Sequence, residues 1–114
     1  MKTILFILES DHLQTALWEE LQKTHLVLSC SAEDATAKIR YQQPDAMILD
    51  LFLPGLDGFS ILETLEFRPQ VVIMLTPLVT QSILDTADQL GCRLILKPCT
   101  VKHILSQLKE RMGE

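Results

Sequence analysis

The chain has 114 residues, enough for one domain with its own buried core. Its content of 47% hydrophobic and 22% charged residues is typical of a soluble globular protein. A net charge of −5 without a basic cluster argues against direct binding of nucleic acid, and no apolar run is long enough to span a membrane. Cys30, Cys92 and Cys99 show neither CxxC nor Cys/His metal spacing, so we expect reduced thiols and a cytoplasmic protein.

The first apolar run, at residues 4–8, predicts a strand. Leucines at every fourth position from 13 to 21 predict a helix after it, with Asp11 and Gln14 as the capping pair at its start. The strand and helix together form the first of several similar units.

The second and third apolar runs, at residues 26–30 and 46–49, predict two more strands. Ser31 with Asp34 is expected to open the helix between them. The third strand runs into the stretch DLFLPGLDG at 50–58, whose Pro-Gly and Asp-Gly pairs predict turns before a further helix.

The last two apolar runs, at residues 71–75 and 93–96, complete a set of five predicted strands. Helical spacing at 83–90 ends at Gly91, which is a natural stop, and Thr100 is placed to cap the final helix. Most of the five runs are continuous rather than alternating, which is typical of strands buried on both faces.

Strict alternation of strands and helices predicts a single α/β domain over residues 1–114, a (βα)5 doubly wound fold with a five-stranded parallel sheet. Neither GxGxxG nor a GK[ST] loop is present, which disfavours dinucleotide and nucleoside-triphosphate binding. The three histidines lack ligand spacing and are expected on the surface. We expect burial to be heaviest at one set of strand residues: Ile4, Phe6, Leu8, Met47, Leu49, Val72, Met74 and Leu96.

In such a fold the functional groups gather where the carboxyl ends of the strands meet. These ends carry Glu9-Ser10-Asp11, then Asp50, then Thr76-Pro77, and finally Lys97-Pro98. Carboxylates beside a hydroxyl and an ammonium group suit Mg²⁺ and a phosphoryl group. The simpler alternative is that Asp50 only caps its strand and Lys97 is a surface lysine.

The stretch DLFLPGLDG, with VVIMLT and LGCRLILKP downstream, resembles the receiver domains of bacterial two-component response regulators over essentially the whole chain. The resemblance implies a flavodoxin-like sheet of strand order 2-1-3-4-5 and a signalling module rather than an enzyme. It also implies a cis bond between Lys97 and Pro98.

The resemblance assigns roles to the residues at matching positions. Asp50 would be the phosphoacceptor, Thr76 would contact a phosphate oxygen, and Lys97 would neutralise the phosphate. Glu9, Asp50 and the backbone carbonyl of Phe52 would hold Mg²⁺.

Three positions depart from the family pattern. Ser10 stands where the second acid of the metal-binding pair is expected, although a shift of one position would leave Leu8 as the missing acid instead. Pro77 lacks the N–H that relatives direct at the phosphate. Leu94 replaces the aromatic residue that commonly switches position. We therefore expect weak Mg²⁺ binding.

The implied function is acceptance of a phosphoryl group at Asp50 from a histidine kinase or phosphotransfer protein. The signal would pass to an output domain or partner through exposed residues of 80–97 and 100–112, and a second copy of the chain is a further candidate partner. The alternative is a pseudo-receiver, an interaction module that works without phosphate. A small flavin binder is a distant third, because the loops lack the residues that cradle a flavin.

Overall fold

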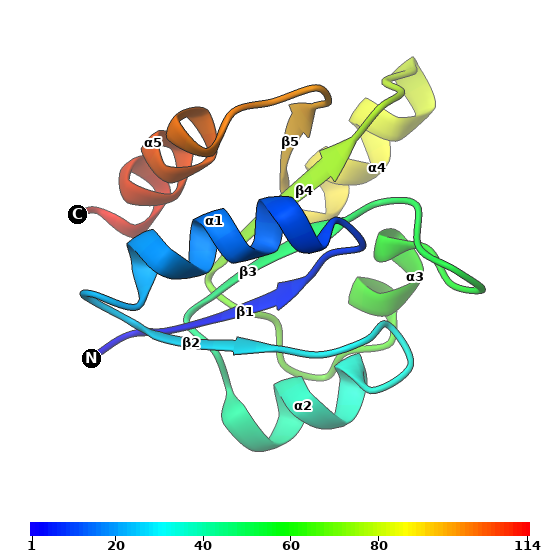
Figure 1. Cartoon of the computed structure of the whole chain (residues 1–114). Helices are drawn as coiled ribbons and strands as arrows, with labels where there is room; N and C mark the ends of the chain where they lie inside the picture. The colour runs from blue at the N-terminus through cyan, green and yellow to red at the C-terminus, as the bar shows by residue number, and fades with distance from the viewer.

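The computed structural model describes the backbone of residues 1–114 and every side chain except that of Asp11. Five strands and five helices alternate along the chain, as predicted (Figure 1). Their bounds are β1 Thr3–Ile7, α1 Asp11–Leu21, β2 Leu26–Ser29, α2 Ala35–Gln42, β3 Ala46–Asp50, α3 Gly58–Glu63, β4 Val71–Thr76, α4 Gln81–Leu90, β5 Arg93–Leu96 and α5 Val101–Met112.

The strands form one parallel sheet in the order β2-β1-β3-β4-β5, which confirms the predicted topology. The chain moves outward from β1 to β2 and then returns to the other side of β1 for the remaining strands. The strand order therefore reverses between β1 and β3, and the crevice at their carboxyl ends is the expected place for a site.

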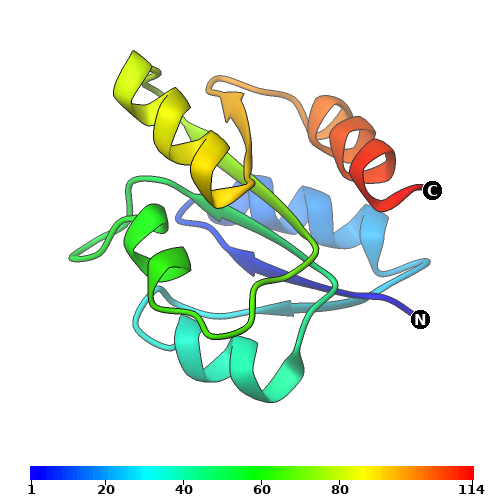
Figure 2. The same cartoon turned by 180° about the vertical axis from the view of Figure 1, so that it is seen from behind.

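Helices cover both faces of the sheet (Figures 1 and 2). Side chains of α1 and α5 pack with one face in a first apolar cluster, and those of α2, α3 and α4 pack with the other face in a second. Burial from both sides explains why the strand sequences are continuous apolar runs. None of the helices that the structure describes is long and apolar enough to cross a membrane.

Two predicted helix starts are wrong in detail. The N-cap of α1 is Ser10, whose Oγ accepts the Leu13 N–H at 3.2 Å, so the predicted capping pair is out by one residue. The side chain of Asp11 lies outside the part of the structure that is described. The second helix begins at Ala35 rather than at Ser31, because the Ser31 hydroxyl donates to the Asp34 carboxylate at 3.2 Å instead of capping a backbone N–H.

The other helix ends follow the sequence signals. Asp57 caps α3 by accepting the Ser60 N–H at 2.8 Å, and Thr100 caps α5 by accepting the His103 N–H at 3.0 Å. Gly91 ends α4 in the left-handed region at φ 72°, a conformation that costs glycine little.

Two predictions of exposure are wrong. Leu96 is 56% exposed, because β5 is an edge strand and this residue lies at its carboxyl end, beyond the covering helices. His25 was expected on the surface, yet only 9% of its side chain is exposed. Of the remaining predicted core residues, Leu8 is half-buried against the first cluster and the others are buried.

Candidate functional site

Asp50 ends β3, the central strand of the sheet, and is only 2% exposed. Its Oδ2 accepts the backbone N–H of Glu9 at 2.8 Å across the crevice between β1 and β3. A buried carboxylate needs compensating partners because its desolvation is costly. The second partner, for Oδ1, is an ammonium group.

Lys97 supplies that group, with Nζ 2.6 Å from Asp50 Oδ1. Oδ1 is buried and accepts no hydrogen bond within ordinary angles, so this contact is an ion pair rather than a well-directed hydrogen bond. The backbone N–H of Lys97 donates to the Thr76 carbonyl at 2.8 Å, which extends the pairing of β4 and β5 up to the site. The Lys97–Pro98 bond is cis, as predicted.

Gly58 allows α3 to begin directly against the end of β3. Its N–H donates to the Leu51 carbonyl at 2.7 Å. A Cβ at this position would lie 2.8 Å from the Asp50 carbonyl oxygen and 2.9 Å from Met74 Cε. Gly58, the last residue of the DLFLPGLDG stretch, therefore allows the close approach to the backbone of the candidate phosphoacceptor.

Thr76 ends β4 beside Asp50 and is fully buried. Its hydroxyl donates to the Leu78 carbonyl at 2.7 Å and accepts the Leu78 N–H at 3.2 Å. We call this pair of contacts the Thr76 hook. It means that the hydroxyl closes its own loop around Pro77, which has no N–H to contribute.

The remaining predicted residues lie around the mouth of the crevice. Glu9 contacts Asp50 only through its backbone, and its side chain is exposed. Ser10 uses its hydroxyl to cap α1, and the Phe52 side chain is exposed. Among the described side chains, no group of three or more His, Cys, Asp or Glu residues is arranged to hold a metal ion.

A hollow of about 600 Å³ opens beside Lys97, between the start of α1 and the start of α5. Ser10 and Pro77 lie on its wall together with Cys99. Burial raises the pKa of the Cys99 thiol, although the nearby Lys97 ammonium opposes the effect. The thiol is therefore a packing group rather than an activated nucleophile.

A comparison with protein families matches residues 5–109 to the response regulator receiver domain. The chain belongs to the response regulator receiver family. Receiver domains act in two-component systems as signalling modules, and they commonly bind Mg²⁺ in the active site and interact with histidine kinases and output domains. The sheet order and the alternating helices agree with the fold of this family.

Among curated proteins, the chain is similar to the transcriptional regulatory protein AfsQ1 of Streptomyces coelicolor, with 35% identity over 77 residues, 66% of this chain and 34% of that protein. The chain spans about a third of the length of the curated relatives it matches.

Solved receiver structures share the fold. A CheY-like receiver from Methanospirillum hungatei has a TM-score of 0.87 at 23% identity, covering 99% of this chain and 94% of that one. The receiver of a sensor histidine kinase from Pseudomonas aeruginosa has a TM-score of 0.78 at 24% identity, covering 99% and 98%. The latter structure has a magnesium ion coordinated in its active-site cleft.

The structure thus brings together Asp50, Lys97 and the backbone of Glu9, and it places Thr76 on the neighbouring strand. Sequence reasoning missed the Glu9 N–H as a partner of Asp50 and missed Leu78 as the partner of Thr76. No residue type signals the Glu9 N–H. The contact of Thr76 with the backbone two residues on is one that threonine makes in turns, so Thr76 before Pro77 was its only signal.

Proposed function

We propose that the chain, as one receiver domain over residues 1–114, accepts a phosphoryl group on Asp50 from a histidine kinase or phosphotransfer protein. The observation that carries this proposal is the buried Asp50 carboxylate held 2.6 Å from the Lys97 ammonium at the carboxyl ends of the strands. A strand-end cap would not need a buried carboxylate with its own cation.

Asp50 Oδ1 is the attacking atom in this proposal, since it accepts no hydrogen bond while Oδ2 is held by the Glu9 N–H. A new O–P bond forms to Asp50 as the P–N bond of the donor phosphohistidine breaks, and the imidazole leaves. Lys97 then moves from the carboxylate to the phosphoryl oxygens, whose charge it neutralises. The hollow lined by Lys97, Ser10 and Pro77 opens next to this ion pair.

Mg²⁺ would neutralise charge on the phosphoryl oxygens, and Glu9, Asp50 and the Phe52 carbonyl are the groups that would hold it. The fit is adequate for an ion that keeps most of its waters, because Mg²⁺ is commonly bound by only one or two carboxylates. Affinity should be low. Both Asp50 oxygens already have partners, and Ser10 offers a hydroxyl, already used as a helix cap, where a second acid would add charge.

Phosphorylation is coupled in this proposal to the Thr76 hook. The Thr76 hydroxyl can donate to a phosphoryl oxygen only if it stops donating to the Leu78 carbonyl. The loop around Pro77 would then be released from the end of β4. This gives the phosphorylated state a route to α4, which follows the loop.

The test is incubation with acetyl phosphate and Mg²⁺, followed by intact mass, with Asp50→Asn as control. We expect slow addition of one phosphoryl group to the wild type and none to the variant.

Ser10→Asp should raise the affinity for Mg²⁺, measured by NMR titration near Asp50, and speed the addition of the phosphoryl group. This variant should keep α1 intact because aspartate caps helices as well as serine does. Adding Pro77→Ala to Ser10→Asp should speed phosphorylation of Asp50 further.

We propose that the signal leaves through the α4–β5–α5 face. Exposed leucines lie on the loop before α4, on α4 itself and on β5, at Leu78, Leu84 and Leu96. Amide shift changes on addition of the true partner should map to 80–97 and 100–112. Changes confined to α1 and α2 would rule this face out. A second copy of the chain on the face would appear as a dimer in sedimentation.

The alternative is a pseudo-receiver that binds its partner without phosphate, and one observation favours it. In the resting site Asp50 Oδ2 is bonded to the Glu9 N–H, Oδ1 is ion-paired with Lys97, and Thr76 is hooked to Leu78. Partner binding that is equal for wild type and Asp50→Asn, with no mass gain from acetyl phosphate, would support this function over phosphoryl transfer.

A further inference from the structure

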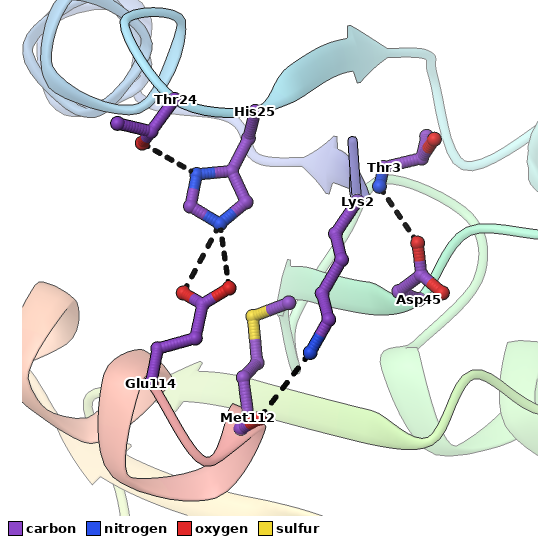
Figure 3. A network of polar contacts seen from close by, with 7 residues as sticks. All are labelled: Lys2, Thr3, Thr24, His25, Asp45, Met112 and Glu114. Atoms are coloured by element: carbon purple, nitrogen blue, oxygen red, sulfur yellow. Dashed lines mark hydrogen bonds and ion pairs between the residues drawn. The ribbon is translucent and has the colours of Figure 1, made fainter.

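A second polar network lies at the amino-terminal ends of the strands, away from Asp50 (Figure 3). His25 Nε2 is 3.1 Å and 3.2 Å from the two carboxylate oxygens of Glu114, and its Nδ1 is 2.8 Å from Thr24 Oγ1. We call these three residues the His25 latch. It joins the turn between α1 and β2 to the end of α5, and beside it Lys2 Nζ donates to the Met112 carbonyl at 3.4 Å.

Backbone contacts hold both partners of the latch in position. The His25 N–H donates to the Leu21 carbonyl at 2.8 Å, which fixes the histidine to the end of α1. Gly113 ends α5 in the left-handed region at φ 74°, and the Glu114 N–H then donates back to the Lys109 carbonyl at 2.9 Å. Because this helix cap already orders Glu114, closing the latch needs little further loss of backbone freedom.

The latch is less exposed than a typical surface ion pair. The side chains of His25 and Glu114 are 9% and 31% exposed, against 66% and 53% for the surface pair of Lys23 and Glu20. Surface pairs contribute little because water and salt screen them, whereas partly buried pairs are screened less. Charge on the imidazole therefore affects this contact more than it affects an ordinary surface pair.

Both protonation states of His25 can keep the geometry. A protonated ring donates from both nitrogens, and a neutral ring donates from Nε2 while Nδ1 accepts from the Thr24 hydroxyl, which can act either way. Only the protonated ring forms an ion pair, and charge-assisted hydrogen bonds are about twice as strong as neutral ones. Deprotonation should therefore loosen the latch without abolishing it.

Other charged groups surround the latch from each neighbouring element. Glu20 and Lys23 come from α1 and the turn after it, Lys109 comes from α5, and Lys2 lies before β1. Glu20 is an acid and the other three are bases. Among the described contacts, Glu114 is the only carboxylate within hydrogen-bond distance of the His25 ring.

We propose that the His25 latch is a pH-dependent device that fastens the last turn of α5 to the turn between α1 and β2, tightly when His25 is protonated and loosely when it is neutral. Histidine is the side chain that ordinarily changes charge between about pH 5 and 8. The device does not depend on phosphoryl transfer. It acts on α5, so it would tune how firmly that helix is presented to a partner.

The test follows amide and histidine-ring NMR signals of the whole chain between about pH 5 and 8. We expect the Gly113 and Glu114 amides to shift with the same midpoint as the His25 ring. At each pH the exchange rate of the Gly113 amide in the wild type is divided by the rate in His25→Gln. This ratio should be several-fold below one at the acid end and close to one at the alkaline end.

Three variants separate the latch from general effects of pH. His25→Gln and Glu114→Gln keep hydrogen-bonding groups but cannot form the ion pair, and both should flatten the response of Gly113. His103→Gln removes an exposed histidine from α5 and should leave the pH response of the Gly113 amide unchanged. The proposal is overturned if the Gly113 midpoint persists in His25→Gln, or if His25 titrates while the α5 amides do not respond.

Discussion

Asp50 and Lys97 are coupled at the level of single side chains, because the carboxylate is almost fully buried. Removing one partner of a buried pair leaves an uncompensated charge, and this costs more than losing the pair as a whole. Lys97 is 30% exposed, so water compensates part of that cost.

We expect Lys97→Met to lower the free energy of unfolding by roughly 1–3 kcal/mol, less than the full cost for a dry ion pair. Adding Asp50→Asn should restore stability, because an amide keeps an acceptor for the Glu9 N–H without a stranded charge. Urea unfolding of the wild type, both single variants and the double variant checks this. A double variant less stable than Lys97→Met alone would contradict it.

Gly58→Ala should be costly for a steric reason. The new Cβ would lie 2.8 Å from the Asp50 carbonyl oxygen, and backbone cannot give way as a flexible side chain can. We expect a loss of roughly 1–3 kcal/mol, typical of overpacking, with amide shifts at Asp50 and Leu51. Gly91→Ala is the control. The Cβ added there would have no atom within 4 Å, so only backbone strain is introduced. Unchanged shifts around Asp50 in Gly58→Ala would refute this view of the contact.

The cysteines should react slowly in the folded state. Burial raises the pKa of Cys30 and of Cys92 to about 11, so at pH 8 roughly one molecule in a thousand carries the thiolate at either position. Below that pKa the rate of iodoacetamide labelling should rise about tenfold per pH unit. Cys99, where Lys97 opposes the effect of burial, should react first. If Cys30 were labelled at pH 8 as fast as in urea, burial could not be raising the pKa of its thiol.

At the scale of helices and strands, the sequence predicted the type of every element but not every boundary. Ser10 and Asp11 are adjacent residues that can both cap a helix, and Gln14, three positions after Asp11, favoured Asp11. The choice depends on where the chain leaves β1, a tertiary property. Leu96 was misplaced for a similar reason, because an apolar run does not reveal which strand lies at the edge of the sheet.

The loop between β4 and α4 is an element whose order depends on one hydroxyl. Thr76→Val keeps the shape of the side chain but removes both contacts of the hook with Leu78. We expect several-fold faster hydrogen exchange at residues 78–80 in the unphosphorylated protein and a loss of roughly 0.5–1.5 kcal/mol, the usual net contribution of a hydrogen bond, because water can reach the exposed Leu78. Thr76→Ser should behave like the wild type. Equal exchange in all three proteins would mean that the hook does not order the loop.

For the whole molecule, topology is what made the candidate site predictable. Parallel strands place all their carboxyl ends at one edge, so Asp50, Thr76 and Lys97 could be expected near one another from their positions after apolar runs. The latch at the opposite edge was not predictable. Its histidine precedes β2 and its acid follows α5, and no spacing rule links residues 89 positions apart.

The same two-sided sheet predicts how stability is distributed. Leu49 lies on β3 between two covered faces and is fully buried in the second cluster, whereas Leu96 is exposed at the edge. Leu49→Ala removes packed methyl groups and leaves a cavity, so we expect a loss of about 2–5 kcal/mol in the free energy of unfolding. Leu96→Ala makes the same chemical change on the surface and should stay within about 0.5 kcal/mol of the wild type. Urea unfolding followed by circular dichroism measures both. If the Leu49 variant were as stable as the Leu96 variant, β3 could not be the central buried strand, and the placement of Asp50 at the sheet crevice would fall with it.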